Sequence, residues 1–443
     1  MGHLHRAGRV EHGEPLVPRL AGLGLDRCAA DAGDALLFFF RLYAVHLRGF
    51  LPARKGNRFR QARRVSLTAS TAAATLPPAS RFHPSEEHMP KPSKSKLSGK
   101  VQTVLGPIEP GQLGITHTHE HLLIDLTCYF QMPEEASRRA DVHAPLTMDM
   151  LGRMEKAWYY NLDNNQLFSV ERAIEEVMEF KLNGGNSLVD TTNIGLARDP
   201  LALARISRAA GLNVIMGASH YVPVSYPADM SKRSEDAIAS QIIRDLTEGV
   251  GDTGVRSGVI GEIGVVWPMT PDQRKVLRAS ARAQVETGAP ILIHSGGHND
   301  SPSEILDVLA ESGADPKRII MGHLDFAIQD RKALKRLAKS GCFLEYDIFG
   351  IEGSGIEYMG YEMQLMNDVQ RLETFEFLIE GGHGDQLLCA QDVCQKRQYT
   401  RYGGKGYGHI LGSIVPRMRR RGFTQAQIDK ILVHNPARAL TFA

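Results

Sequence analysis

The most informative residues of this 443-residue chain are histidines and carboxylates that stand near the ends of short apolar runs. One run leads into the segment 117–121 (HTHEH), and four others lead to Glu262, His294, His323 and Asp392. Imidazole nitrogens and carboxylate oxygens are the ligands that zinc and related divalent cations prefer. A single His-x-His pair or strand-end aspartate is more often structural, but the repeated pattern predicts a site for two divalent cations.

Eight short β-rich runs, most of them separated by helical patterns, would position these residues. The runs cover residues 114–122, 187–193, 213–221, 258–265, 290–296, 318–325, 342–349 and 387–393. One helix is expected at 169–183 with Ser169 as its N-cap, and another begins with a capping box at 270–273. Eight β/α alternations predict an α/β protein with a single (β/α)8 TIM barrel. An open doubly wound sheet is the alternative, but no phosphate-binding glycine fingerprint follows the first run.

The ligand candidates would meet at the C-terminal ends of the barrel strands, where such barrels carry their sites. His119 and His121 alternate along the first strand, so both should project into the barrel mouth. His117 shares their direction but lies one pleat deeper, and we interpret it as a hydrogen-bonded core histidine. Glu120 points the other way and is expected to be structural. Asp325, at the end of the sixth strand, either relays a proton, orients a metal ligand or caps the next helix.

Several of these segments resemble, in order, the motifs of the phosphotriesterase branch of the amidohydrolase superfamily. They are 114–116 (GIT), 118–121 (THEH), 258–264 (GVIGEIG), 321–325 (MGHLD) and 391–394 (QDVC). The match is closest to the phosphotriesterase-related proteins, since it includes 97–106 (LSGKVQTVLG) and 401–409 (RYGGKGYGH) and covers residues 97–443. The resemblance implies a binuclear metal-dependent hydrolase.

The resemblance also implies a ligand set for two divalent metal ions, zinc in the first place with manganese or cobalt as alternatives. It places His119, His121 and Asp392 on one metal, His294 and His323 on the other, and Glu262 between the two. Many members bridge the metals with a carboxylated lysine, but the corresponding position here is Gly261, as in a glutamate-bridged subgroup. Because adjacent strand residues face opposite sides, Glu262 can bridge only if its strand twists or bulges.

The implied reaction is hydrolysis by a bridging hydroxide, with Asp392 as the catalytic proton acceptor. The motifs leave open whether the substrate is an amide, a lactone or carboxylic ester, or a phosphotriester. The resemblance to the phosphotriesterase-related proteins favours a small-molecule amide. We expect an anionic one, such as an N-acyl amino acid or a related sulfonate, because four basic residues follow the eighth run: Lys396, Arg397, Arg401 and Lys405. A non-catalytic metal-binding protein is the alternative from another class.

The first part of the chain differs in composition from the rest. Residues 1–97 hold 16 Lys and Arg against 7 Asp and Glu, whereas residues 98–443 hold 36 against 43. We expect residues 1–96 to be a disordered basic extension, with Met89 the preferred translation start, and residues 97–443 to form the barrel. The acidic balance of the larger part argues against a nucleic-acid partner.

The remaining composition favours a cytoplasmic protein without a membrane partner. The most apolar stretch of the extension, 35–51, is interrupted by charges and too short to span a bilayer. Five cysteines without a CxxC pair indicate a reducing compartment. A homodimer is possible for a barrel of this kind, but no surface stripe in the sequence decides the oligomeric state.

Overall fold

The structure is a computed structural model that describes residues 97–358 and 361–443. The interpretation of residues 1–96 as a disordered extension, with Met89 as the preferred translation start, lies outside the described residues. Within the described part of the chain, no helix is long and apolar enough to cross a membrane.

Eight parallel strands form one sheet that curls into the predicted TIM barrel, and each strand lies inside one of the predicted runs. Hydrogen-bonded neighbours follow chain order from the first strand to the last. The strands are β3 (Thr116–Glu120), β6 (Ser187–Asp190), β7 (Asn213–Ala218), β8 (Val259–Gly264), β9 (Ile291–His294), β10 (Ile319–Gly322), β11 (Phe343–Tyr346) and β14 (Leu387–Cys389).

Apolar side chains from successive strands fill the inside of the barrel. Every residue of β9 and β10 is buried, which is why these strands read as continuous apolar runs rather than as alternating ones. One fully buried cluster takes a residue from each of seven barrel strands: Val189, Ile215, Val259, Leu292, Ile320, Phe343 and Leu388. This packed floor leaves only the strand ends open for a site.

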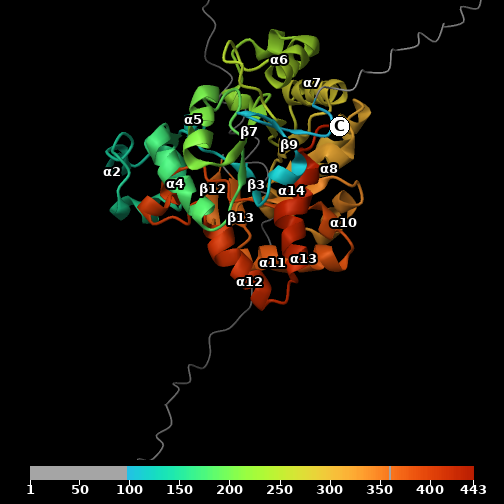
Figure 1. Ribbon diagram of the computed structural model, residues 1–443. Helices are drawn as coiled ribbons and strands as arrows, with labels where there is room; N and C mark the ends of the chain where they lie inside the picture. Colours follow the sequence, from blue (N-terminus) through green and yellow to red (C-terminus); the bar gives the residue numbers. More distant parts are fainter. Residues whose placement is uncertain (1–96, 359–360) are drawn as a thin grey trace, which may run out of the picture. The chain divides into compact units, whose positions relative to one another are not determined.

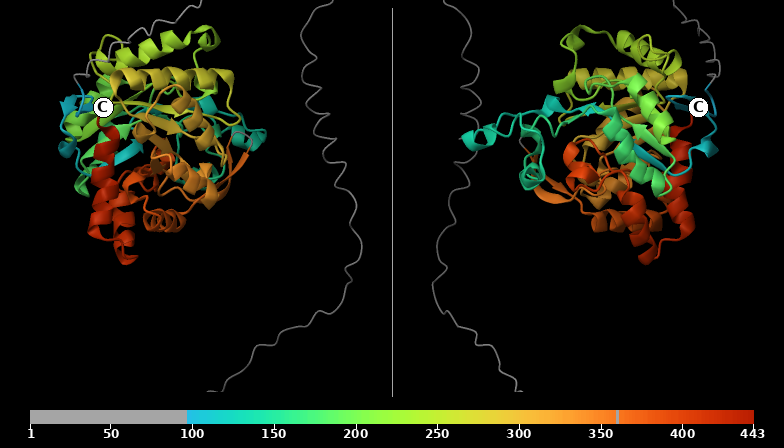
Figure 2. Two further views of the ribbon diagram at one scale, coloured as in Figure 1. Left: turned by 90° about the vertical axis from the view of Figure 1, so that its right-hand side faces the viewer. Right: turned by 60° about the vertical axis from the view of Figure 1, so that its left-hand side comes forward.

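Helices surround the strands, as the labelled elements of Figure 1 show. The longer ones are α4 (Val170–Leu182), α5 (Pro200–Ala210), α6 (Glu235–Thr247), α7 (Pro271–Thr287), α8 (Ser301–Glu311), α10 (Arg331–Ala338) and α11 (Asp368–Glu380). Helices α6 and α7 lie side by side in every view (Figures 1 and 2) and are joined by the Arg278–Glu235 ion pair, 2.8 Å between Nε and Oε2.

The two helices expected from capping signals are confirmed. Ser169 accepts a hydrogen bond from the Arg172 N–H at the start of α4. Thr270 and Gln273 form the capping box of α7, and Gly288 ends that helix in the left-handed conformation with φ 75°.

Short elements complete the described chain. Three pairs of short strands run antiparallel: β1 (Val101–Thr103) with β2 (Gly106–Ile108), β4 (Ile124–Asp125) with β5 (Gln166–Leu167), and β12 (Gly353–Tyr358) with β13 (Tyr361–Leu365). The short helices are α2 (Ala136–Arg139), α3 (Leu151–Met154), α9 (Leu324–Ala327), α12 (Val415–Arg420), α13 (Gln425–Asp429) and α14 (Asn435–Leu440). The β12–β13 hairpin follows the seventh barrel strand and was not expected from the sequence.

Glu120 joins the first and last barrel strands. Its buried carboxylate accepts the N–H groups of Gln391 at 2.9 Å and Val393 at 3.0 Å. Between them, the Asp392 N–H donates to the His119 carbonyl at 3.2 Å. Glu120 is therefore structural, as expected, and its specific role is to close the barrel.

Replacing Glu120 by Gln should lower the free energy of unfolding by about 2–4 kcal/mol, because the amide NH2 would face a backbone N–H donor. Chemical denaturation followed by circular dichroism measures the change. Glu171→Gln, which removes an exposed ion pair with Arg205, is the control and should leave the free energy of unfolding nearly unchanged. Equal effects of the two substitutions would contradict a closing role for Glu120.

Candidate metal centre

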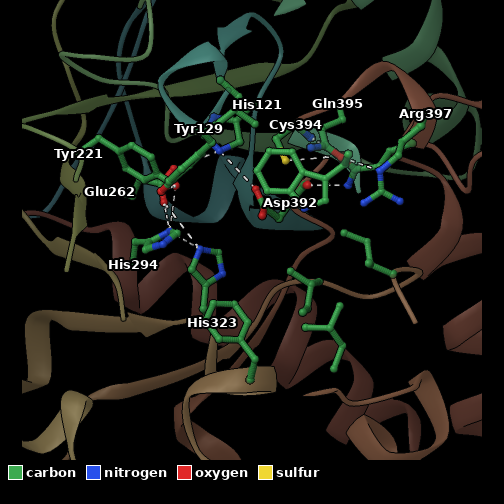
Figure 3. A pocket seen from close by; sticks show the side chains of 17 residues that line it. His121, Tyr129, Tyr221, Glu262, His294, His323, Asp392, Cys394, Gln395 and Arg397 are labelled. Carbon is green, nitrogen blue, oxygen red and sulfur yellow. Dashed lines mark hydrogen bonds and ion pairs between the residues drawn. The ribbon is translucent and has the colours of Figure 1, made fainter. Parts of the chain in front are cut away.

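The four predicted histidine ligands converge on the carboxylate of Glu262. Its Oε1 lies 3.1 Å from His121 Nε2. Its Oε2 lies 2.9 Å from His294 Nδ1, 3.5 Å from His119 Nε2 and 3.7 Å from His323 Nε2. The two carboxylate oxygens thus face four imidazoles from the ends of three strands, β3, β9 and β10, as the labelled side chains of Figure 3 show in part.

Asp392 completes the group. Its Oδ1 lies 3.3 Å from His121 Nε2 and 3.9 Å from His119 Nε2. The Asp392 side chain is 17% exposed, against 2% for Glu262. It is consequently the carboxylate of this group that a molecule in the barrel mouth can reach.

A β-bulge turns Glu262 toward the mouth. Ala218 of β7 pairs with both Ile260 and Gly261, and the register between β8 and β9 shifts just before Ile263. The bulge reverses the side-chain alternation, so the condition set by strand geometry for a bridging Glu262 is met. Gly261 has φ 147°, and a Cβ there would collide with the Leu292 carbonyl oxygen. A lysine therefore does not fit at this position.

Asp347 holds two of the imidazoles by their other ring nitrogens. Its Oδ1 lies 2.7 Å from His323 Nδ1, and its Oδ2 lies 3.1 Å from His119 Nδ1. Nδ1 of both rings therefore donates to Asp347, and Nε2 of both rings is left facing Glu262. Glu345 adds a second buried carboxylate 3.4 Å from His119 Nδ1, and burial raises its pKa.

Asp347 and Glu345 were not predicted from the sequence. They could have been found from the pattern of their own run, 342–349, which is mostly apolar but carries carboxylates at two alternate positions. Their side chains share a direction with Phe343, which faces the barrel interior.

A hydroxyl fixes the orientation of His121. The Thr192 Oγ1 donates to the Leu123 carbonyl at 2.9 Å, so it accepts a hydrogen bond from His121 Nδ1 at 2.8 Å. The His121 Nε2 is left facing Glu262 and Asp392. Three of the four imidazoles thus present Nε2 to the centre, and His294 presents Nδ1.

The neighbouring carboxylates favour a positive charge on His119 and His121, whereas burial and the nearby His323 lower the pKa of His294. Burial opposes a charged His119, but Asp347 and Glu262 outweigh it and raise the His119 pKa well above its ordinary value. Burial also opposes a charged His121, whose pKa Asp392 and Glu262 nevertheless raise to about 9. Protons balance the buried carboxylates here, and a divalent cation would take their place.

The donor set fits a metal. Within the described chain, His119 Nε2 has no hydrogen-bond partner although it is buried. An orphaned, inward-facing imidazole nitrogen is costly unless a ligand occupies the space beside it. Imidazole nitrogens are borderline donors and carboxylate oxygens are hard ones, and a site that combines four of the first with two of the second suits zinc, with manganese and cobalt as alternatives.

Two nearby predictions about core residues have clear outcomes. His117 is a buried core histidine as expected, and its Nδ1 contacts Glu120 Oε1 at 3.1 Å. Asp325 neither contacts one of the predicted ligand histidines nor caps the next helix: it accepts the Asp347 N–H at 2.8 Å and forms an ion pair with buried Arg371. It therefore steadies the residue that orients the metal ligands.

A pocket opens beside the centre (Figure 3). Tyr221 lines it, with its hydroxyl 3.0 Å from that of Tyr129 and 3.4 Å from His294 Nδ1. Cys394 also lines it, but burial raises the pKa of its thiol well above the ordinary value, which disfavours a nucleophilic thiolate. The other wall residues are largely apolar: Leu126, Trp158, Phe326, Ile348, Ile351 and Leu365.

Residues 99–440 match the model of the phosphotriesterase family. The chain belongs to the phosphotriesterase family. N-acetyltaurine hydrolase of Salmo salar is 41% identical over 349 residues, which cover 79% of this chain and 99% of that protein. N-acetyltaurine hydrolase of Homo sapiens is 40% identical with the same coverage.

Solved structures of similar proteins agree with this assignment. A resiniferatoxin-binding protein from Rhodobacter sphaeroides is 36% identical with a TM-score of 0.75, over 79% of this chain and 98% of that one. The lactonase Lmo2620 from Listeria monocytogenes is 25% identical with a TM-score of 0.63, over 78% and 99%. This phosphotriesterase-family chain is therefore a hydrolase, as the resemblance of its motifs implied.

Replacing Asp347 by Asn should weaken zinc binding about 10–100-fold, because an amide offers only one acceptor atom for two imidazole donors. Competition with a chelator of known affinity measures the change. Asp307→Asn, at an exposed position of α8, removes the same charge and should leave zinc affinity unchanged. Full affinity in the Asp347 variant would show that the imidazoles are held without it.

Proposed function

We propose that this protein is a binuclear metal-dependent hydrolase of small amides. The arrangement of Glu262 carries the proposal, since its two carboxylate oxygens face four imidazoles from the ends of three strands. In the proposed assignment Glu262 bridges the cations and the other residues divide between them: His119, His121 and Asp392 hold one, and His294 and His323 hold the other. Zinc is the preferred metal.

Bound divalent cations would supply positive charge to polarise a carbonyl oxygen, and an acidified water as the hydroxide nucleophile. The chain itself supplies the proton acceptor. Burial opposes ionisation of Asp392, but His121 outweighs it and lowers the Asp392 pKa, so the carboxylate is ionised and able to accept a proton. Its partial exposure places that carboxylate at the pocket.

The proposed substrates are N-acetyltaurine and similar N-acyl amino acids. Support comes from relatives about 40% identical over nearly their full length, which are N-acetyltaurine hydrolases. An apolar pocket wall suits the short acyl chain of such an amide. Lactone hydrolysis is the second candidate, because the same wall suits an uncharged ring and a lactonase shares the fold at 25% identity.

The protein purified without chelators should contain about two metal ions per chain, as elemental mass spectrometry measures. Glu262→Ala should bring this number to one or below, because the proposed bridge is lost while its neighbours remain. Glu171→Ala, at an exposed site, is the control. A ratio near one that added zinc, manganese or cobalt does not raise would contradict a binuclear centre.

Replacing Asp392 by Asn should lower kcat for N-acetyltaurine by about 10²–10⁴-fold, because the proton acceptor is lost. Taurine release measures turnover, and metal content is determined on the same sample. Cys394→Ser, two residues along the chain in the same pocket, should retain turnover. Unchanged kcat in the Asp392 variant at full metal loading would remove this carboxylate from the mechanism.

A further inference from the structure

The four basic residues after β14 have different surroundings, and only one of them belongs to the pocket. Lys396 forms an ion pair with Asp163, 2.6 Å between Nζ and Oδ1. Arg401 and Lys405 are exposed and lie outside this pocket's lining. Arg397 is half-buried and lines the same pocket as Glu262 and Asp392.

Neighbouring amides hold Arg397 in place. Its Nε donates to Gln395 Oε1 at 2.6 Å, and its backbone N–H donates to Asn164 Oδ1 at 3.0 Å. Gln395 in turn donates to Asn165 Oδ1 at 3.3 Å. These bonds use the Nε and leave the end of the guanidinium available.

The positive charge of Arg397 is not paired. Among the residues that the structure describes, no carboxylate forms an ion pair with it and its two Nη groups have no hydrogen-bond partner. Burial lowers the Arg397 pKa, yet a guanidinium remains charged at neutral pH. The Glu155 carboxylate acts on Arg397 only at longer range, raising its pKa without forming an ion pair, so a partly desolvated guanidinium in this corner of the pocket still favours an anion in direct contact.

Arg397 lies away from the metal ligands along the pocket. In Figure 3, Glu262 and His294 stand at one end and Arg397 at the other, with Cys394 and Gln395 on the wall between them. A substrate with a scissile carbonyl at one end and an anion at the other matches this separation. The planar guanidinium fork also matches the paired oxygens of a carboxylate or sulfonate.

We propose that Arg397 binds the carboxylate or sulfonate of an N-acyl amino acid or N-acyl amino sulfonate and thereby sets the preference for anionic amides. This inference rests on the proposed amidase function and names the residue that selects its substrate. Arg397 acts on the far end of the substrate, so it should affect recognition of charge rather than the bond-breaking step.

Steady-state kinetics of the full-length, metal-loaded protein test the selectivity. The substrates are N-acetyltaurine and N-propylacetamide, an uncharged amide of similar length. Arg397→Gln should lower kcat/KM for N-acetyltaurine about 10–100-fold, mainly through KM, and change that for the uncharged amide less than about threefold. Arg397→Lys should recover part of the loss.

Arg401→Gln is the matched control, since it removes the same charge from an exposed position four residues away. It should leave both substrates unaffected. Equal losses for the charged and uncharged amides in Arg397→Gln, at unchanged metal content, would overturn the proposal. So would unchanged kinetics for N-acetyltaurine in that variant.

Calorimetry with 1-propanesulfonate distinguishes failure of this proposal from failure of the proposed amidase function. Binding that is retained in Arg401→Gln and weakened at least about tenfold in Arg397→Gln supports the assignment, even if no amide is cleaved. A protein that cleaves N-acetyltaurine but binds the sulfonate equally well with or without Arg397 remains an amidase and overturns the assignment. Absence of binding by the unchanged protein also overturns it.

Discussion

The position of one carboxylate, that of Glu262, is the constraint on which the rest of the site depends. Regular alternation along β8 would direct this side chain at the surrounding helices, and the bulge at Ile260–Gly261 redirects it into the mouth. Once there, its two oxygens give four imidazoles a common centre of negative charge. The glycine before it is required because the adjacent Leu292 carbonyl leaves no room for a Cβ.

The orientation of the imidazoles depends on a buried network that extends well beyond them. Asp347 is held by Asp325, which pairs with Arg371; Arg371 also binds Asp368 Oδ1 at 2.8 Å, and His409 contacts the other oxygen of Asp368 at 2.7 Å. All five are buried. Buried ion pairs contribute more to a unique geometry than to net stability. The network thus connects the centre to α11 and the chain beyond β14.

The sequence predicted the barrel and the six converging residues because both depend on local patterns. Apolar runs marked the strands, and their polar ends marked the mouth. The positioning residues were less predictable. Glu345 lies in β11 and Asp347 follows it directly, and both contact His119, which lies more than 200 residues earlier in the chain. The β12–β13 hairpin was also missed, although apolar and polar residues alternate along both of its strands, because the segment was interpreted as a loop after the seventh strand. From side-chain alternation the sequence showed only that the strand of Glu262 must twist or bulge if Glu262 is to face the mouth. Whether it does so depends on its register with both neighbouring strands, which the sequence does not give.

Because Glu120 closes the barrel, it also affects when, during synthesis, the chain can first form its candidate metal centre. The N–H groups that Glu120 binds belong to Gln391 and Val393, the two neighbours of Asp392. When the last strand pairs with the first, it therefore brings Asp392, the last of the six predicted metal ligands, into place. A nascent chain that has not yet released residues 387–393 from the ribosome has an open sheet and an incomplete set of ligands. Completion of the fold and acquisition of the full centre are thus a single late event.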